Sequence, residues 1–500
     1  MTNKSNRCAR YLRYTGVAFS MLVLLIAMVL LIAMGIAQFY FTTSYAQGQP
    51  MLPSTDARPT WAQMISQWGE ALLGKIEQHS HSNTYHEPPP KFAATREAMQ
   101  TLAAKMREFA PAREQTVDEN DVIELDVRTL SHGQVVPIRG NVRLVPANAD
   151  LWQQNISFVI TDSDTTLDCQ GALMSSTDDT ITAIAVHTPP DQTTGVHNVR
   201  IKNCLTLGYN HGLIIEQQTP ANARYESLTA GKTTLAAQRE QSPHDIWVDS
   251  LLVAHTRSSG IFIGDHVQRV DLYGIGVVKA GTVGLYFEFG SGHNTVSHSY
   301  FSQNGFRIGK PNREAIAIDS SVNNRIEYSH FDHNGAGGIF LYRNCFEHAD
   351  DPSRSNHFLR TQGSDSNQIV HNVFANEPVS VWIAARQSRN LKGFACGAYT
   401  ISETPFARYH LDEAERNQVL NNDFTSGKNA IIIEDDNNLV QGNCFASDLE
   451  QPIVIGSTIR EQSSEGVVKN NRILDNRCAN GARQPTIEFV GHSQAYTQTQ

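Results

Sequence analysis

Charged and phenolic side chains follow a series of short apolar segments, in each case where the segment ends. In chain order, this charged row consists of Asp265, Glu288, Asp319, Tyr342, Arg343, Arg386, Glu434 and Asp435. Solvent-facing turns usually hold Gly, Asn, Ser and Asp, whereas this row mixes acids with two arginines and a tyrosine. Two interpretations remain open: ion pairing between neighbouring members of the row, and a site that binds a charged sugar polymer.

The residue types in and around the row suit proton abstraction next to a carboxylate. Elimination or epimerisation of a uronic acid begins with loss of the C5 proton, so the site needs a group that neutralises the carboxylate, a base and a proton donor. Candidate catalytic residues of these types are Tyr342, Arg343, Arg386, Lys310 and His348. The segment from Arg307 to Arg313 adds three cations within seven residues, and it is either a solvated loop or a clamp for a substrate carboxylate.

The acids of the row leave a second kind of chemistry open. A glycoside hydrolase needs two carboxylates whose separation sets the stereochemistry of the product, and Glu288 and Asp319 stand in neighbouring repeats. We expect the substrate-binding residues to be Arg307, Arg313, Glu288, Asp319, Asp265 and Glu434. The one cofactor for which the sequence offers ligands is calcium, because Asp435 and Asp436 supply oxygen atoms, although without a recognisable loop pattern.

A repeat explains how residues far apart in the sequence come to form one row. It consists of an Asn, an aliphatic residue two positions later and a Phe seven positions later, and its clearest copies begin at Asn294, Asn324, Asn367, Asn417 and Asn438. A second short strand follows each copy, and two of these strands begin 24 residues apart, at Gly260 and Gly284. That spacing matches one coil of a parallel β-helix, in which identical positions stack into ladders one strand spacing apart. The pattern therefore predicts an internal Asn ladder and a Phe stack, both with structural roles.

Three insertions interrupt the regular coil length, at 216–243, 344–365 and 385–415. Each of them follows a second strand, so we expect all three to project from the same corner of the coil, beside the charged row. Loops held by a rigid scaffold commonly carry function. Cys345 and Cys396 lie in two of these insertions on neighbouring coils, which permits a disulfide between them.

The stretches DTTLDCQGALM (164–174) and VHNVRIKNC (196–204), together with the repeats, carry a resemblance to a known group. They resemble right-handed parallel β-helix proteins of the carbohydrate-binding and sugar-hydrolase group, which includes pectate lyases, alginate lyases, mannuronan C5-epimerases and NosD-like proteins. The resemblance covers roughly 145–485 and implies an all-β solenoid that handles polysaccharide. It departs from the epimerases at their Asp-Pro-His-Asp motif, for which the nearest string here is Ser242-Pro243-His244-Asp245.

The N-terminal region predicts export. Residues 1–46 combine a basic flank with an uncharged apolar run from Gly16 to Phe41, which is typical of a signal peptide or a signal anchor. Cleavage after Ala46 would release the protein, whereas retention would anchor it to the inner membrane through residues 16–41. Residues 47–118 are predicted to form a linker and two helices, at 60–78 and 91–110, that cap or precede the β-helix of 119–490. The expected location is periplasmic or extracellular.

The net charge and the cysteine count agree with this organisation. A formal net charge of −10 argues against nucleic acid as a partner and points to an acidic polysaccharide only if the site is locally basic. Six of the seven cysteines follow the export segment, an even number that permits disulfides. The sequence favours a lyase or C5-epimerase acting on a uronic-acid-containing polysaccharide. A hydrolase, and a non-catalytic polysaccharide-binding or envelope assembly protein, remain as alternatives; the last is favoured if the charges of the row all pair with one another.

Overall fold

A computed structural model describes residues 89–110, 113, 121–307, 310–354, 357–447, 449–477 and 484–500. The predicted export segment of 1–46 and the predicted helix of 60–78 lie outside these residues. In the described part of the chain, no helix combines the length and apolar character needed to cross a membrane. The predicted helix of 91–110 is confirmed as α3, Pro89–Phe109.

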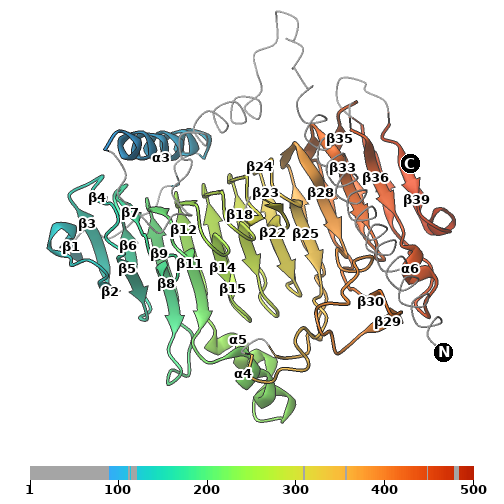
Figure 1. Cartoon of the computed structure of the whole chain (residues 1–500), viewed down its shortest axis with the longest axis horizontal. Helices are drawn as coiled ribbons and strands as arrows, with labels where there is room; N and C mark the ends of the chain where they lie inside the picture. The colour runs from blue at the N-terminus through green and yellow to red at the C-terminus, as the bar shows by residue number, and fades with distance from the viewer. Residues whose placement is uncertain are drawn as a thin grey trace, which may run out of the picture. The chain divides into compact units, whose positions relative to one another are not determined.

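The inner coils each contribute one strand to each of three parallel sheets, and Figure 1 shows the strands of successive coils side by side. Sheet 1 contains β1 (Val122–Asp126), β3 (Asn141–Val145), β6 (Thr166–Asp168), β9 (His197–Lys202), β12 (His244–Asp249), β15 (Gln268–Tyr273), β18 (Thr295–Ser297), β23 (Arg325–Glu327), β26 (Gln368–Val370), β31 (Gln418–Leu420), β34 (Leu439–Gln441), β37 (Arg472–Leu474) and β39 (Gln498–Thr499). Sheet 2 contains β4 (Asp150–Leu151), β7 (Leu173–Ser175), β10 (Leu205–Leu207), β13 (Leu252–Ala254), β16 (Gly276–Val278), β19 (Tyr300–Ser302), β24 (His330–Asp332), β27 (Val373–Ala375), β32 (Asp423–Phe424) and β35 (Cys444–Phe445). Sheet 3 contains β2 (Val135–Ile138), β5 (Ser157–Ile160), β8 (Thr182–Thr188), β11 (His211–Gln217), β14 (Ile261–Ile263), β17 (Leu285–Phe287), β22 (Glu314–Asp319), β25 (Gly337–Tyr342), β28 (Glu377–Ile383), β33 (Gly427–Ile433), β36 (Gln451–Ile455) and β38 (Ile487–Phe489). This arrangement is a parallel β-helix, as the sequence predicts.

Alternation of side chains along each strand fills the core. In sheet 3, Ile261 pairs in register with Leu285, and Ile263 pairs with Phe287. All four side chains point inward and are fully buried. Successive residues of a strand face opposite sides of the sheet, so the residue between each buried pair faces outward. The second strands therefore carry both the core and an outer surface.

The predicted Asn ladder and Phe stack are confirmed. The side-chain amide of Asn294 donates to Asn324 Oδ1 over 2.9 Å, and the ladder continues from Asn324 to Asn367 and from Asn367 to Asn417. The rings of Phe301, Phe331, Phe374, Phe424 and Phe445 stack with centroids 4.8 to 5.2 Å apart. A second ladder, which the sequence analysis missed, links Asn372, Asn422, Asn443 and Asn476.

The turns explain the glycines and asparagines between strands. Asn198 and Asn323, which lead into sheet 1, have φ values of 53° and 56°, a left-handed conformation that Asn tolerates better than most residues. Gly284 precedes β17 where the next coil lies close, and a Cβ there would approach the carbonyl oxygen of Ala315 to 2.6 Å. Short side chains are thus required where coils stack most tightly.

Helix α3 packs against the outer face of sheet 2. Its buried residues Met99, Leu102 and Met106 form one apolar cluster with residues of five strands of that sheet, among them Leu205 and Leu252. The helix therefore covers a flank of the solenoid along several coils.

The insertions project from the corner that joins sheet 3 to sheet 1. The first contains α4 (Ala221–Thr229) and α5 (Leu235–Gln241), and the last contains the hairpin of β29 (Thr400–Glu403) and β30 (Arg408–His410). Figure 1 shows these elements at the same edge of the solenoid. A smaller hairpin, β20 (Phe306–Arg307) and β21 (Lys310–Pro311), precedes β22 at the opposite end of the sheet 3 strands. Short helices at α6 (Thr458–Glu461), Val127–Thr129 and Ser493–Tyr496 complete the described elements.

Candidate functional site

Arginines from the insertions pair with most acids of the charged row. Asp265 accepts a hydrogen bond from Arg224 of α4, with 3.0 Å between Nε and Oδ2, and a second oxygen contacts the same guanidinium. His266 also contacts Asp265, with 3.2 Å between Nδ1 and Oδ2. Asp265 and Arg224 are both buried, so this pair fixes the first insertion to the solenoid.

Glu288 and Asp319, the predicted carboxylate pair, share one buried arginine. Arg360 lies 2.9 Å from Glu288 Oε1 through Nη2 and 3.3 Å from Asp319 Oδ2 through Nε. Asp319 also accepts hydrogen bonds from Tyr286 and Asn344. Burial raises the pKa of Glu288 to about 7, Arg360 opposes this rise, and the charge of Asp319 adds to it. The structure therefore brings these acids together, but around a cation that the sequence analysis missed.

Arg343 holds the last insertion in place. Its guanidinium forms an ion pair with Glu413, donates to the carbonyl oxygen of Leu411 over 3.1 Å and lies 3.8 Å from the ring centroid of Tyr399. Its backbone N–H donates to Asp412 Oδ1 over 2.6 Å. The side chain is buried, and these contacts give it a structural environment.

The two aspartates considered for calcium contact a guanidinium. Arg460 of α6 lies 2.5 Å from Asp435 Oδ1 and 2.9 Å from Asp436 Oδ2. Asp435 also accepts the backbone N–H of Ala414 over 2.6 Å, and Asp436 accepts that of Lys469 over 2.9 Å. Glu415 lies near enough to share a metal ion with both aspartates, but Arg460 already supplies a positive charge at this position.

Tyr342 stands at the centre of a buried polar cluster on the outer face of sheet 3. Its hydroxyl donates to Glu314 Oε1 over 3.1 Å and accepts a hydrogen bond from Arg313 over 2.9 Å. Arg313 also pairs directly with Glu314 over 3.0 Å. Burial and the charge of Glu314 raise the pKa of Tyr342 above its usual range, which keeps the phenol protonated. Arg313 is thus brought to the row, whereas Tyr342 is poorly suited to act as a base.

Arg386 differs from the other arginines of the row. Its guanidinium stacks over Tyr342 at 4.5 Å from the ring centroid. The side chain is 7% exposed, and its Nε, like that of Arg343, has no hydrogen-bond partner among the described residues. Within the same part of the chain, its one ion pair is a 4.0 Å contact with Glu347. A buried charge that is poorly compensated is costly, so this guanidinium is the group in the row most in need of an anion.

A further arginine lies beside Arg386. Arg389 is half-buried, and no described carboxylate forms an ion pair with it. Burial, together with the nearby charge of Arg386, lowers the pKa of Arg389. Arg313, Arg386 and Arg389 thus form a cationic cluster, and Glu314 is the acid that lies among them.

Glu434 has no arginine partner in the described structure. The indole Nε1 of Trp382 lies 3.4 Å from Glu434 Oε2, and Ser388 adds hydrogen bonds from its hydroxyl and its backbone. Burial raises the pKa of Glu434 to about 7, and these hydrogen bonds oppose the rise. The carboxyl is therefore close to half-protonated at neutral pH.

Three predicted site residues lie at the margins. Lys310 is exposed on the β20–β21 hairpin, and Arg307 belongs to the same hairpin. His348 is half-buried in the second insertion, where its backbone N–H contacts the carbonyl oxygen of Phe394. Neither Lys310 nor His348 is shown in contact with Arg386 or Glu434 among the residues that the structure describes.

An aromatic row on the outer face of sheet 3 was missed by the sequence analysis. Phe262 and Tyr286 stack with centroids 5.7 Å apart, and Phe340 meets Trp382 edge to face at 5.4 Å. Phe262, Tyr286 and Trp382 are half-buried. Each lies between two buried residues of a second strand, so period-two alternation could have identified the row.

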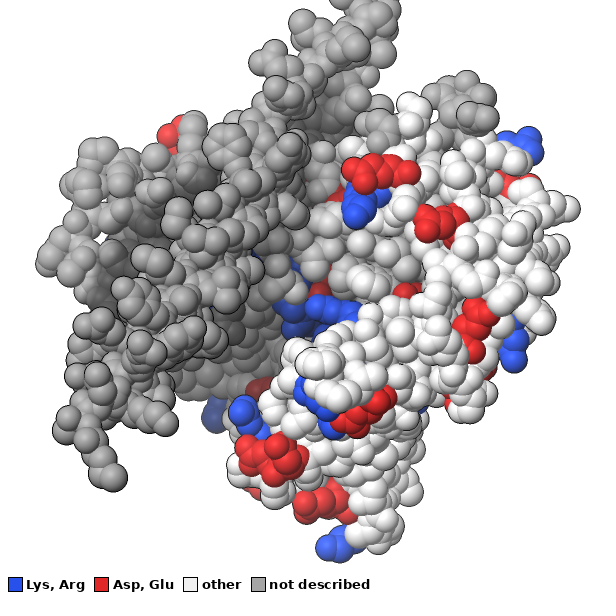
Figure 2. Space-filling model, turned by 45° about the vertical axis from the view of Figure 1, so that its right-hand side comes forward, with Lys and Arg blue, Asp and Glu red and all other residues white. Residues whose placement is uncertain are grey.

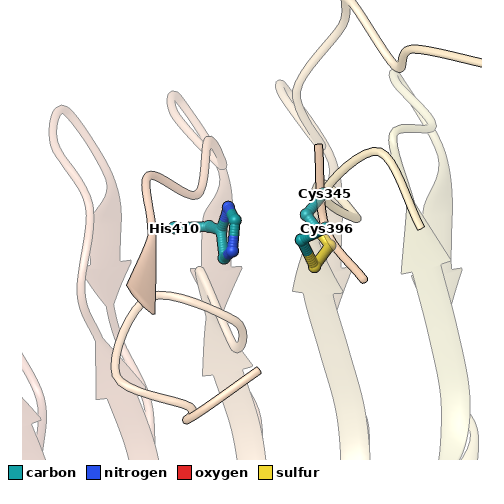
Figure 3. Close-up of side chains that lie close together, drawn as sticks. All are labelled: Cys345, Cys396 and His410. Carbon is teal, nitrogen blue, oxygen red and sulfur yellow. A yellow bond between two sulfur atoms is a disulfide. The ribbon is translucent and has the colours of Figure 1, made fainter. Parts of the chain in front are cut away.

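A disulfide joins two insertions, as predicted. Cys345 and Cys396 are bonded with their Cα atoms 5.5 Å apart, and Figure 3 shows His410 of β30 facing the pair. A second disulfide links Cys169 and Cys204. The donor atoms of Cys345, Cys396 and His410 lie within 4.8 Å of one another, but both sulfurs are already bonded to each other. The cluster therefore ties loops together and leaves only an imidazole nitrogen available for a metal.

Acidic and basic side chains are interspersed on the face shown in Figure 2, often in adjacent pairs. This distribution agrees with the many ion pairs of the insertions. The cationic cluster is thus a local feature of a protein whose net charge is −10.

The chain is similar to several solved structures. No protein-family model matches the chain, and no curated protein matches it in sequence. Among solved structures, the catalytic domain of a GH87 alpha-1,3-glucanase in complex with tetrasaccharides matches with a TM-score of 0.46 and 9% identity, over 90% of this chain and 70% of that chain. A mutant of the periplasmic alginate epimerase AlgG matches with a TM-score of 0.44 and 11% identity, over 91% of this chain and 100% of that chain. The A-module of the Azotobacter vinelandii mannuronan C-5 epimerase AlgE4 matches with a TM-score of 0.38 and 9% identity, over 81% and 96%.

Proposed function

We propose that this protein is exported and acts on a uronic-acid-containing polysaccharide by lyase or C5-epimerase chemistry. The observation that supports this most directly is the buried guanidinium of Arg386, whose one ion pair within the described residues is a 4.0 Å contact with Glu347. A substrate carboxylate would supply the missing acceptors, because the planar guanidinium fork binds carboxylate through two hydrogen bonds. The two disulfides support export to an oxidising compartment.

The proposed chemistry needs the carboxylate to be neutralised when the C5 proton leaves. Negative charge then spreads onto the carboxylate, and a positive group already in position stabilises it. We assign this role to Arg386, with Arg389 and Arg313 beside it. His348 is the proposed base, since imidazole is a common general base and it directly follows Glu347, the ion-pair partner of Arg386.

The outer face of sheet 3 is the proposed binding surface for the sugar chain. Its half-buried aromatic rings, Phe262, Tyr286 and Trp382, offer flat apolar surfaces beside the charged row. Aromatic walls with a few placed polar groups are the usual composition of ligand sites. The exposed Lys310 on its hairpin adds a cation at the other end of the same strands.

A second candidate, non-catalytic polysaccharide binding, is favoured by the ion pairs of the row. Asp265, Glu288, Asp319, Asp435 and Asp436 each contact an arginine, as the non-catalytic hypothesis expects. The same contacts weaken the hydrolase hypothesis, because Glu288 and Asp319 are both occupied by Arg360. Glu434 and Arg386 are the members of the row that distinguish the enzymatic proposal.

Proton NMR in deuterated water separates these functions. Purified full-length protein is incubated with alginate, polygalacturonate and glycosaminoglycans. A new vinylic signal identifies a lyase, and deuterium at C5 without chain cleavage identifies an epimerase. New reducing ends without a double bond identify a hydrolase, and binding without any reaction identifies the non-catalytic protein; either result would overturn the proposal.

A further inference from the structure

We propose that Glu434 is the proton donor of this site, an inference that rests on the function proposed above. Glu434 ends the outward-facing column of β33, directly after Ile433, and its carboxyl contacts the indole of Trp382 from the neighbouring strand β28. Trp382 belongs to the aromatic row, and Ser388, which also contacts Glu434, lies two residues after Arg386. The carboxyl thus contacts the proposed sugar surface, and its partner Ser388 belongs to the same segment as the proposed carboxylate anchor.

The neighbours of Glu434 make it different from the other acids of the row. Arg224, Arg360 and Arg460 form ion pairs with Asp265, Glu288, Asp319, Asp435 and Asp436, whereas the recorded partners of Glu434 are an indole N–H and a serine. Asp412, also nearby, adds negative charge. A carboxyl that is 6% exposed and lacks a counter-ion favours its neutral form. Accordingly, its raised pKa, about 7, matches the requirement of a proton donor at neutral pH.

The proton transfer is balanced as follows in each reaction. In elimination, the C5 proton goes to the base, the electrons of the C5–H bond form the C4=C5 double bond, and the C4–O4 bond breaks. Glu434 then gives its proton to the departing O4 oxygen and becomes a carboxylate. In epimerisation, C4–O4 stays intact and Glu434 gives its proton to C5 on the face opposite to the one that lost its proton.

Trp382 provides a measurement of Glu434 that does not depend on activity. The fluorescence of the full-length protein is followed between pH 5 and 9, and the spectrum of Trp382→Phe is subtracted so that only Trp382 contributes. A transition with a midpoint near 7 is expected, and Glu434→Gln should abolish it. A transition that persists in Glu434→Gln, or no transition in the wild-type protein, would overturn the assignment.

Turnover separates the role of Glu434 from the proposed function as a whole. Glu434→Gln should lower kcat about 100-fold or more while the dissociation constant for the polyuronate stays within about twofold. Glu434→Asp, which keeps the carboxyl but shifts it, should retain part of the activity. Glu403→Gln removes an exposed acid from β29 and serves as the control. Full activity in Glu434→Gln overturns the role of Glu434 alone, whereas a wild-type protein inactive on every polyuronate overturns the proposed function as well.

Discussion

At the residue scale, individual arginines determine which acids of the charged row are neutralised by an ion pair. Arg224, Arg360 and Arg460 each extend from a segment outside the regular coil and neutralise acids of the stacked strands. Arg386 extends from the same corner but receives only a distant carboxylate. The row is therefore divided into members that hold insertions in place and a pair, Arg386 and Glu434, that is available for a ligand.

Replacing Arg360 should destabilise the folded protein, because Arg360 neutralises two buried acids. Arg360→Met is expected to lower the free energy of unfolding at pH 8 by about 3–5 kcal/mol, because Glu288 and Asp319 would remain buried without a counter-charge. Burial raises the pKa of Glu288 above its unfolded value and Arg360 opposes this rise, so without Arg360 the penalty from Glu288 applies above its unfolded pKa and fades as the pH falls toward it. Urea unfolding at pH 8 and pH 4.5 tests this.

Arg257→Met is the matched control for that experiment. Arg257 pairs with Asp179 at the surface, where both side chains are more than half exposed. Its loss should change the free energy of unfolding by less than about 1 kcal/mol at either pH. An equal loss of stability in Arg360→Met at both pH values would contradict the proposed role of Arg360.

At the scale of the elements, ladders of buried amides hold successive coils in register. Amides such as those of Asn294, Asn324 and Asn367 donate to the next coil, whereas the amide nitrogen of Asn417 has no hydrogen-bond partner among the described residues. A third ladder runs from Asn304 to Asn334 and ends at Glu377, whose Oε1 accepts the Asn334 amide over 2.6 Å. Its other oxygen has no hydrogen-bond partner among the described residues. The ladder thus ends on a buried acid.

Glu377→Gln should stabilise the protein at alkaline pH. Burial raises the pKa of Glu377 well above its ordinary value of 4.5, although hydrogen bonds from Asn334 oppose the rise. The unfolded chain therefore releases this proton first, and the folded protein loses stability as the pH rises above 4.5. Glutamine keeps the acceptor and removes the ionisation. Thermal unfolding should show a higher Tm for Glu377→Gln at pH 8 and no gain at pH 4.

An exposed glutamate gives the comparison for Glu377. Glu226 lies exposed on α4, and Glu226→Gln should leave the pH dependence of the Tm unchanged. If Glu377→Gln gains as much stability at pH 4 as at pH 8, the buried carboxyl is not the cause.

The disulfide between two insertions should limit their opening. The double variant Cys345→Ser, Cys396→Ser is expected to speed trypsin cleavage after Lys392, because the third insertion loses its covalent link to the second. Mass spectrometry of timed digests measures the rate. The pair Cys169 and Cys204 lies elsewhere in the solenoid, so its removal should not speed this cleavage. An unchanged rate in the first variant would show that Arg343 and its contacts suffice to hold the insertion.

At the scale of the whole molecule, the solenoid could be predicted because its signal repeats. Asn294, Phe301 and their equivalents recur at fixed offsets, and each copy supports the others. The partners of the charged row could not be predicted in the same way, because Arg224 and Arg360 lie inside insertions that have no register with the ladders. The aromatic row, by contrast, could have been predicted, because Phe262 and Tyr286 occupy the outward position that strand alternation defines.

Because the protein carries a negative net charge, binding of a polyanionic substrate would depend on the cationic cluster. A protein of charge −10 repels a polyanion at long range, so attraction must come from Arg313, Arg386 and Arg389 at short range. Salt screens the long-range repulsion with a Debye length of about 10 Å at 0.1 M. Moderate salt should therefore weaken binding less than it would for a protein whose overall charge attracts the polymer.

Isothermal titration of the full-length protein with a defined oligouronate, and with a neutral oligosaccharide of equal length, tests the central claim most directly. Wild-type protein should bind the oligouronate in preference, and Arg386→Ala should weaken that binding by about 10- to 100-fold, the loss expected for hydrogen bonds to a charged group. Arg416→Ala removes an exposed arginine of the same corner and should change the affinity by less than about twofold. Equal affinity of wild-type protein and Arg386→Ala, or equal affinity for the neutral oligosaccharide, would contradict the assignment of Arg386 as the carboxylate anchor.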